Sequence, residues 1–306
     1  MLESLSEKDL YVMFDETKDE KNEPVGAILV GNLENTDKPF VLYIGQMSVV
    51  NADSIASLVN EQFCKRFPAK SFKLFLTDGA PCCVKAGVKL RNLFDMIHVT
   101  CVVHATHLAF EEIRKQAPIA NEAICTLKSL LAKSGSRRSM FPVAIPPWPV
   151  ITRWGTWISC GLYLANNFSV IKSFVLNLED EGLIVAAAKE AWGMANLEAE
   201  LAQLLPLGYA VEMQKKLEGR QLLNESLHFL NEFKEAVAGT PAELKLAVTL
   251  DKNSGFKLLR EQPCTFRNAP IVTADVERLF SRMKATQTAK PNINIETMHK
   301  LLFMAL

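Results

Sequence analysis

The sequence predicts an α/β fold built on a mixed β-sheet. Three short runs of β-branched and aromatic residues, at positions 11–14, 25–30 and 40–50, are separated by turn-rich segments, which is typical of an antiparallel meander. Helical and strand-like patterns then alternate as far as residue 116. The chain has 306 residues, of which 49% are hydrophobic, so it can bury a substantial core.

The alternating part begins with a helix that Asn51 or Asp53 can cap and that ends before Pro68. Further along the chain we expect a strand at 72–76, a helix at 80–94, a strand at 98–102 and a helix at 105–116. Three antiparallel strands followed by this αβαβα order are typical of a ribonuclease H-like core, in which ligands gather at the strand ends.

A change in composition divides the chain after the alternating part. Basic and serine-rich residues, followed by a proline-rich stretch, predict an extended connection. Beyond it, helical spacing predicts four or five helices, then a polar connection, a helix capped by Thr273 and a last helix at 295–306. The predicted organisation is a first part of the core at 1–132, a linker at 133–151, an all-helical insertion domain at 152–250, and a return to the core at 251–306.

Three carboxylates stand at the ends of predicted elements. Asp15 follows the run at 11–14, Asp78 follows the strand at 72–76, and Glu277 lies near the start of a late helix. Two hard cations about 3.5–4 Å apart need shared ligands of this kind, remote in sequence but adjacent in space. Each acid also has a simpler interpretation: Asp15 as a turn residue, Asp78 as a helix cap, and Glu277 as a first-turn acid that complements the helix dipole.

Five short motifs occur in an order that resembles the landmarks of hAT-type transposases, over nearly the whole chain. The motifs are Phe14-Asp15-Glu16-Thr17, Thr77-Asp78-Gly79-Ala80, Cys101-Val102-Val103-His104, Thr152-Arg153-Trp154-Gly155-Thr156-Trp157 and Val276-Glu277-Arg278-Leu279-Phe280-Ser281. Three of them carry the acids at the expected element ends. The resemblance implies a ribonuclease H-like core interrupted by a helical insertion domain, and a C-terminal segment through which subunits associate as a homo-oligomer.

The resemblance also implies a role for the three acids. Asp15, Asp78 and Glu277 correspond to the DDE triad, which binds two Mg²⁺ or Mn²⁺ ions that activate water or a 3′-hydroxyl against a DNA phosphodiester. Full-length transposases of this type begin with a BED zinc finger, and no such set of Cys and His ligands precedes Asp15. We therefore expect a truncated or domesticated relic whose contact with DNA is weak or non-specific.

Arg153 and Trp154 are candidate DNA-binding residues. In the transposases that the chain resembles, this tryptophan stacks on a base extruded beside the cleavage site, and Arg153 is placed to hold a nearby phosphate. The alternative is that Trp154 anchors the first insertion helix, with Trp148 and Trp157 packed beside it. Gly155 departs from the small polar residue usual in the family, so the start of the helix there is open.

Arg137 and Arg138 belong to a local basic cluster with Lys133 and Arg153. The cluster is consistent with contact to a phosphate backbone, but the pattern favours a solvated linker. Aromatic residues do not interleave with these charges, and no helix carries a basic stripe. Sequence-specific reading of DNA is therefore not predicted.

Cys101 and His104 match the CxxH signature of the family, and His107 extends it to C-x₂-H-x₂-H. A structural zinc site needs four ligands, and no fourth partner stands nearby in sequence. We therefore expect no zinc. Cys101 is predicted to be a buried small hydrophobe, and His104 or His107 a hydrogen-bonded residue close to the active face.

Composition indicates the partners and the cellular compartment that can be expected for the protein. Lys and Arg number 34, as do Asp and Glu, so no global field attracts the chain to a polyanion. Seven cysteines without CxxC spacing favour reduced thiols in the nucleus or cytoplasm. The polar N-terminus and the lack of a long apolar run argue against secretion and against a membrane span.

Two functions of different classes remain at this point. The first is a hAT-like, transposase-derived enzyme that cleaves and transfers DNA strands by a two-metal DDE mechanism. The second is a catalytically idle, domesticated transposase that acts as a dimerisation or nucleic-acid-associated interaction module. A generic exonuclease on the same core is a third and weaker hypothesis.

Overall fold

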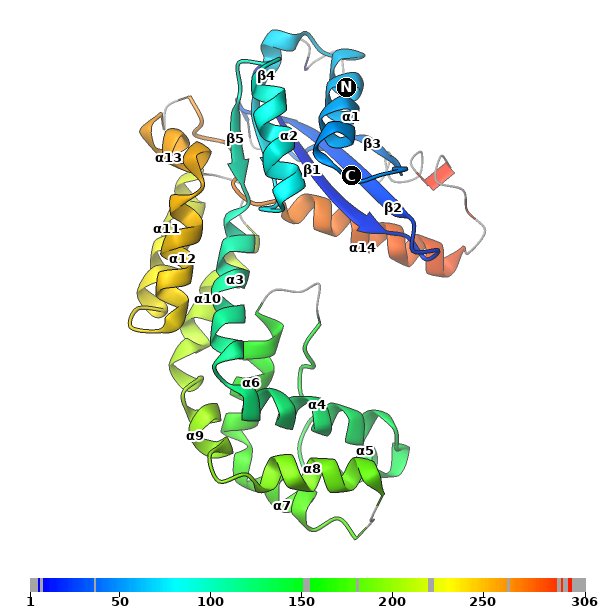
Figure 1. Ribbon diagram of the computed structural model, residues 1–306, viewed down its shortest axis with the longest axis vertical. Helices are drawn as coiled ribbons and strands as arrows, with labels where there is room; N and C mark the ends of the chain where they lie inside the picture. Colours follow the sequence, from blue (N-terminus) through cyan, green and yellow to red (C-terminus); the bar gives the residue numbers. More distant parts are fainter. Residues whose placement is uncertain are drawn as a thin grey trace. The chain divides into compact units, whose positions relative to one another are not determined.

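The computed structural model describes residues 5, 8–35, 37–150, 155–179, 182–219, 223–262, 265–290, 293 and 297–298. Within this part of the chain, five strands form a single mixed sheet in the order β3-β2-β1-β4-β5 (Figure 1). The strands are β1 (Leu10–Lys18), β2 (Pro24–Asn32), β3 (Phe40–Gln46), β4 (Phe72–Thr77) and β5 (Ile97–Thr100). The α/β class and the mixed sheet predicted from the sequence are confirmed.

The sheet combines an antiparallel half with a parallel half. β1 runs antiparallel to β2, and β2 runs antiparallel to β3, which is the predicted meander. β1 is parallel to β4, and β4 is parallel to β5. Parallel neighbours need a crossover connection, and helices supply it between these strands. The carboxyl ends of β1, β4 and β5 therefore lie at the same edge of the sheet.

Most of the chain outside the sheet is helical. The helices that flank the strands are α1 (Ala52–Cys64), η2 (Ala69–Ser71), α2 (Pro81–Arg91), α3 (Val102–Lys115), α13 (Ser254–Glu261) and α14 (Ala274–Ala289). The others are α4 (Pro118–Ala132), α5 (Gly135–Met140), α6 (Thr156–Asn166), α7 (Phe168–Leu176), α8 (Leu183–Gly193), α9 (Leu197–Ala202), η3 (Leu205–Leu207), α10 (Gly208–Glu218), α11 (Leu223–Ala236) and α12 (Pro241–Asp251).

Helices cover both faces of the sheet (Figure 1). On one face α1 and α2 pack over alternate residues of β1, namely Leu10, Val12 and Phe14. Aromatic rings dominate this core, with the ring centroids of Phe63 and Phe72 4.8 Å apart. On the other face α14 packs against β1 and β2 through buried apolar residues that include Leu279 and Met283. Because side chains alternate along a strand, Asp15 faces α14 and Glu16 faces α2.

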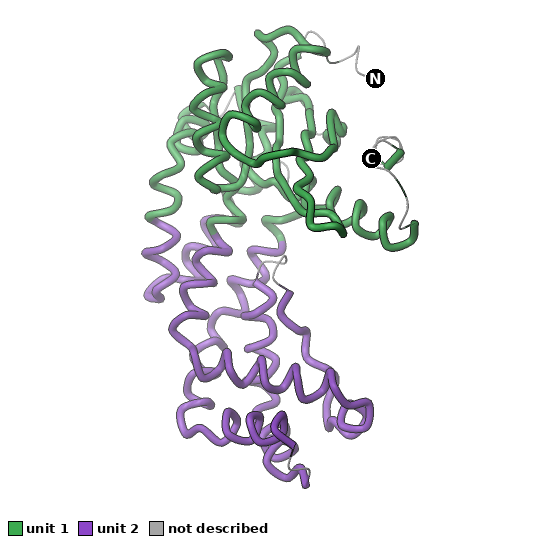
Figure 2. Tube along the Cα trace, turned by 45° about the vertical axis from the view of Figure 1, so that its right-hand side comes forward, with its two compact units in different colours: residues 1–105, 216–229, 248–306 green, residues 106–215, 230–247 purple. Residues whose placement is uncertain are grey.

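The chain forms two compact units (Figure 2). Unit 1 contains residues 1–105, 216–229 and 248–306, and with them the whole sheet. Unit 2 contains residues 106–215 and 230–247 and is helical. In unit 2, α4 packs against α8 and α9, and the indole N–H of the fully buried Trp192 donates to the carbonyl of Ala123 at 3.2 Å. This packing explains why the helical unit begins earlier in the chain than the insertion predicted from residue 152.

Three segments differ from the expected organisation. Residues 135–140, expected in an extended linker, form the short helix α5, which the Ser134 side chain caps. The polar connection expected at 251–270 contains α13, which the Asn253 side chain caps and whose residues Phe256 and Leu259 are buried. The predicted last helix at 295–306 lies almost entirely outside the described residues.

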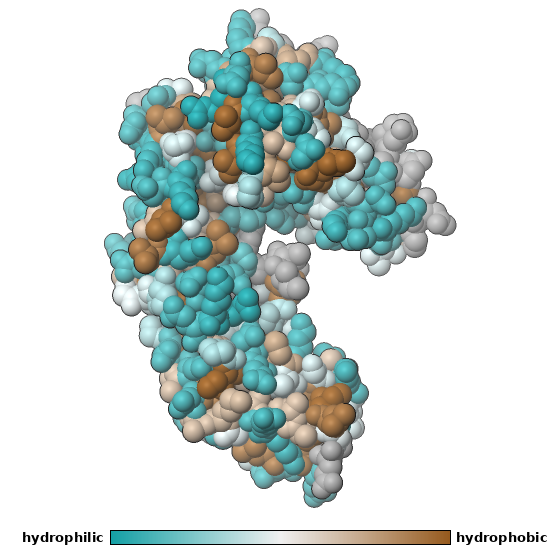
Figure 3. Space-filling view, viewed as in Figure 1, coloured by the Kyte–Doolittle hydropathy of each residue, from teal (hydrophilic) through white to brown (hydrophobic). Residues whose placement is uncertain are grey.

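The exposed surface is mixed in character. In Figure 3, separate groups of hydrophobic residues stand among hydrophilic ones. The large exposed hydrophobic residues of unit 1 include Val84, Val88 and Leu93. In the part of the chain that the structure describes, no helix combines the length and the apolar character required to cross a bilayer.

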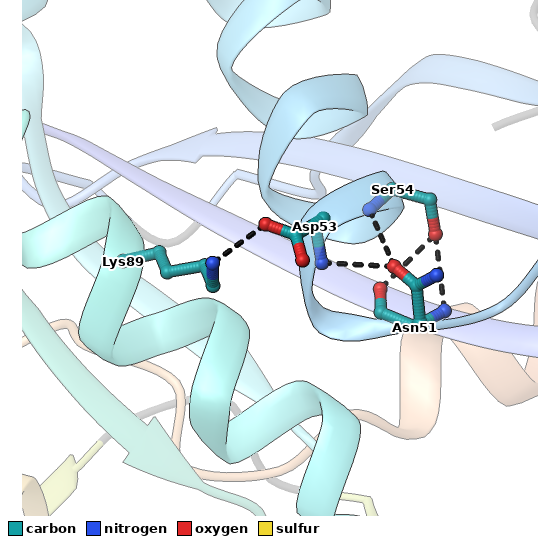
Figure 4. A network of polar contacts seen from close by, with 4 residues as sticks. All are labelled: Asn51, Asp53, Ser54 and Lys89. Carbon is teal, nitrogen blue, oxygen red and sulfur yellow. Dashed lines mark hydrogen bonds and ion pairs between the residues drawn. The ribbon is translucent and has the colours of Figure 1, made fainter.

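The start of α1 shows how local sequence fixes an element (Figure 4). The Asn51 side chain accepts hydrogen bonds from the backbone N–H groups of Asp53 and Ser54, both at 2.9 Å. The Ser54 hydroxyl in turn accepts from the backbone N–H of Asn51 at 3.0 Å, which completes a capping box. Of the two predicted caps, Asn51 is therefore the one used.

Asn51→Ala is expected to lower the free energy of unfolding by about 1 kcal/mol, because N–H groups of the first turn of α1 lose their acceptor. Urea unfolding followed by circular dichroism measures the change. Asp53→Asn is the control, because the ion pair of Asp53 with Lys89 at 2.6 Å is largely solvent-exposed and contributes less than about 0.5 kcal/mol. Equal losses in the two variants would contradict the assignment of the cap.

Candidate functional site

Two of the predicted acids lie side by side at the carboxyl edge of the parallel strands. The last paired residues of β1 and β4 are Met13 and Leu76, and two residues further along each chain stand Asp15 and Asp78. β1 continues to Lys18 by pairing with β2, so Asp15 lies inside a strand rather than at its end. Asp78 directly follows β4, and its carboxylate accepts a hydrogen bond from the backbone N–H of Ala80 at 3.0 Å.

The third acid reaches the same place because the start of α14 is tied to the end of β5. The backbone N–H of Val102 donates to the carbonyl of Ile271 at 3.0 Å. The backbone N–H of Thr273 donates to the Cys101 sulfur at 3.3 Å. Thr273 occupies the predicted N-cap position, although its side chain makes no capping hydrogen bond. Glu277 follows in the first turn, close enough to Asp15 for the charge of Glu277 to raise the pKa of Asp15.

The buried Asp15 and the half-buried Glu277 are neighbouring acids of like charge. Burial raises the pKa of Asp15 well above its usual range, and the charges of Glu277 and Asp78 raise it further, against the opposing effects of His104 and the Glu16 N–H. Burial also raises the pKa of Glu277. Both carboxyl groups therefore bind a proton more readily than exposed acids would.

His104 stands beside this pair in the first turn of α3. Its Nε2 lies 3.9 Å from a carboxylate oxygen of Glu277. Burial opposes protonation of His104, but the Cys101 sulfur, by charge and hydrogen bond, together with the charges of Asp15 and Asp78, outweighs burial and raises the pKa to about 9. At neutral pH the imidazolium therefore supplies a positive charge among the acids. The predicted position of His104 close to the acids agrees with this geometry.

A fourth acid approaches Asp78 from the opposite face of β1. Burial raises the pKa of Glu16, and the charge of Asp78 raises it further. The thiol of the buried Cys83, on the first turn of α2, lies 3.8 Å from a Glu16 carboxylate oxygen, and burial together with the charges of Asp78 and Glu16 raises its pKa. Sequence reasoning grouped Glu16 with solvated turn acids. Side chains alternate between the two faces of β1. Once the strand is known to continue past Asp15, this alternation places Glu16 on the face opposite Asp15.

The predicted DNA-binding residues belong to two other segments of the chain. Arg137 and Arg138 lie on α5, in unit 2. Arg153 and Trp154 lie outside the described residues. Gly155 has φ of 67° and serves as the N-cap of α6, which begins at Thr156. Glycine adopts this left-handed conformation at little cost because it has no Cβ atom, and the helix start that the sequence left open is at Thr156.

Neither the arrangement of possible metal ligands nor comparison with known proteins assigns a function to the acidic cluster. Within the described part of the chain, no group of three His, Cys, Asp or Glu side chains is placed to hold a metal ion. Comparison with protein-family models and with curated proteins found no match. The fold and the site together define an α/β protein with an acidic cluster at the carboxyl edge of two parallel strands, and the functional interpretation depends on that geometry.

Proposed function

We propose that the chain is a hAT-like, transposase-derived protein whose acidic cluster catalyses metal-dependent cleavage and transfer of DNA strands. The observation that carries the proposal is the convergence of Asp15, Asp78 and Glu277. They come from β1, the end of β4 and α14, and 262 residues separate the first from the last (277 minus 15). A turn residue, a helix cap and an unrelated first-turn acid would have no reason to influence one another, whereas the charges of Glu277 and Asp78 both raise the pKa of Asp15.

The topology supports a ribonuclease H-like core. Three antiparallel strands precede two parallel ones, and the sheet order is β3-β2-β1-β4-β5. The acids lie at the carboxyl edge, where α/β sheets hold their ligands. The helical unit occupies the sequence between β5 and α14, as an insertion into such a core would.

The donor chemistry of the cluster fits Mg²⁺ or Mn²⁺. Asp15, Asp78 and Glu277 offer carboxylate oxygens, which these hard ions prefer. Mutual repulsion raises the pKa of Asp15, and a cation would relieve that repulsion. When bound, the ions would supply an activated oxygen nucleophile and neutralise charge on the phosphate. Because the described side chains include no ready group of three ligands, the carboxylates must draw closer together for a cation to bind.

The residues of the chain have distinct tasks in this proposal. Asp15 and Glu277 would supply cation ligands on the α14 side of the sheet, and both must be deprotonated for a cation to bind. Asp78 supplies a carboxylate from the end of β4. His104 places a positive charge next to the acids, where it would attract a DNA phosphate.

Calorimetric titration with Mn²⁺ tests the proposal. Wild-type protein is expected to bind Mn²⁺, and Asp78→Ala is expected to bind at least about 100-fold more weakly, because a charged oxygen ligand is lost. Asp95→Ala, at an exposed acid outside the cluster, is the matched control and should bind as wild type does.

A plasmid-nicking assay in Mn²⁺ extends the test from binding to chemistry. Nicking by wild type and by Asp95→Ala, but not by Asp78→Ala, is the expected result. Failure of the wild-type protein to bind Mn²⁺ would exclude the metal-dependent mechanism.

A further inference from the structure

A chain of hydrogen bonds links the backbone of Asp78 to a histidine on the neighbouring strand. The hydroxyl of Thr77, a fully buried residue, donates to the carbonyl of Asp78 at 2.8 Å. The same hydroxyl oxygen lies 2.9 Å from Nε2 of His98 on β5. A hydroxyl has a single proton, and here the Asp78 carbonyl receives it. Nε2 of His98 must therefore carry the proton of the second hydrogen bond and donate it to Thr77.

Close packing holds His98 in this position. A Cβ atom on Gly87 of α2 would stand 2.4 Å from Nδ1 of the imidazole, so only glycine leaves room for the ring there. A Cβ atom on Gly255 of α13 would stand 1.8 Å from the His98 carbonyl oxygen. The ring of Phe75 covers a further side, at 5.4 Å between centroids. The imidazole thus packs against α2 and β4, and α13 packs on the backbone of the same residue.

The tautomer and charge of His98 agree with a fixed donor. Burial and the positive charge of Arg91, against the opposing charge of Asp78, together lower the pKa of His98 to about 4. At neutral pH the ring is therefore uncharged, and its single proton is on Nε2. A buried neutral histidine is a poor choice for packing alone, because an apolar side chain of similar size needs no hydrogen-bond partner.

We propose that His98 is a positioning residue for the acidic cluster. Through the Thr77 hydroxyl, His98 fixes the backbone of Asp78, so that the Asp78 carboxylate stays beside Asp15. The inference rests on the proposed function, because it assigns His98 to the cation site. Asp78 lies beyond the last residue of β4, so the sheet ladder no longer holds it. The Thr77 hydroxyl and the N–H of Ala80 are the contacts that replace the ladder.

Thr77→Val tests the inference because it removes the hydroxyl and keeps the shape of the side chain. We expect Mn²⁺ affinity to fall about tenfold, the size of effect that outer-sphere partners of metal ligands have. Thr77→Ser keeps the hydroxyl and should bind Mn²⁺ within about twofold of wild type. Asn51→Ala destabilises α1 away from the site, and unchanged affinity in that variant shows that lower stability alone does not weaken binding.

A second readout needs no metal. Hydrogen exchange of the Ala80 amide, measured by NMR, reports how firmly the Asp78 carboxylate is held. We expect the exchange to be about tenfold faster in Thr77→Val than in wild type, and unchanged in Thr77→Ser. If Thr77→Val does not fold, His98→Leu, which removes the donor from the same chain of hydrogen bonds, takes its place in both measurements.

The outcomes separate the two proposals. Wild-type Ala80 exchange and wild-type Mn²⁺ affinity in Thr77→Val would overturn the role of His98 and leave the proposed function intact. Absence of Mn²⁺ binding by the wild-type protein would overturn the proposed function, and the Ala80 exchange would still decide whether Thr77 and His98 position Asp78.

Discussion

Asp15→Asn is expected to abolish Mn²⁺ binding and, at neutral pH, to make the protein more stable. Asparagine has nearly the same shape as aspartate, and its amide can donate a hydrogen bond to Glu277. It removes one of two carboxylates that burial and mutual repulsion disfavour. Loss of a charged ligand should weaken Mn²⁺ binding at least about 100-fold. Relief of repulsion should raise Tm by roughly 2–4 °C, or about 1 kcal/mol.

The sign of the pH dependence follows from the direction of the pKa shift. The pKa of Asp15 is raised in the folded protein above its ordinary value of 3.8. The contribution of Asp15 to stability is therefore fully present below that value and is lost as pH rises through the folded pKa. Asp15→Asn should match wild type in acid and become the more stable protein as pH increases.

Thermal unfolding between pH 3.5 and 8, with Mn²⁺ titration at neutral pH, measures both effects of Asp15→Asn. Asp95→Asn removes the same charge from an exposed site and should change neither Tm nor affinity appreciably. A lower Tm at neutral pH for Asp15→Asn would show that repulsion between Asp15 and Glu277 does not destabilise the folded protein. Retained Mn²⁺ binding would show that Asp15 is not a ligand.

Gly255→Ala is expected to destabilise unit 1 by about 3 kcal/mol or more. The added methyl group would stand 1.8 Å from the backbone carbonyl oxygen of His98, and a backbone atom cannot turn aside as a flexible side chain can. α13 would have to move away from β5. That movement would break the bonds of the Asn253 amide group to the N–H and C=O of Thr100, at 3.3 and 2.7 Å.

Helix propensity predicts the opposite sign for Gly255→Ala, because alanine is favoured over glycine within a helix by about 1 kcal/mol. Gly193→Ala, at the end of α8, separates the two effects, since a Cβ atom there meets nothing within 4 Å. That variant should be neutral or slightly stabilised. Urea unfolding followed by tryptophan fluorescence and circular dichroism compares the two, and equal stabilities would show that α13 does not pack on β5 as described.

Local patterns predicted much of the sheet half of the chain. Alternating β-branched and aromatic runs indicated the meander, and the strand ends near Asp15 and Asp78 followed from them. The extent of β1 was underestimated because its last residues, 15–18, are polar, and β2 rather than hydrophobicity holds them in the sheet. α13 was missed for a related reason, because its short apolar stripe is surrounded by polar residues and becomes stable by packing on β5.

The candidate site was predictable only in part. The three acids were selected because of their element ends and the resemblance, whereas contact between Asp15 and Glu277 depends on how α14 packs on β1. His98 packs against Gly255, which lies 157 positions further along the chain (255 minus 98). A local sequence pattern cannot indicate a contact at that separation. No role was predicted for Cys83 either, because its position near Glu16 and Asp78 arises only when the chain folds.

The late position of α14 has a consequence during synthesis. In a nascent polypeptide, Glu277 is added 199 residues after Asp78 (277 minus 78). Until then the α14-facing side of β1, with Tyr11 and Met13, lacks α14 as its covering helix. A chain that stops before α14 therefore has an incomplete acidic cluster, and the exposed sheet face makes such chains candidates for chaperone binding.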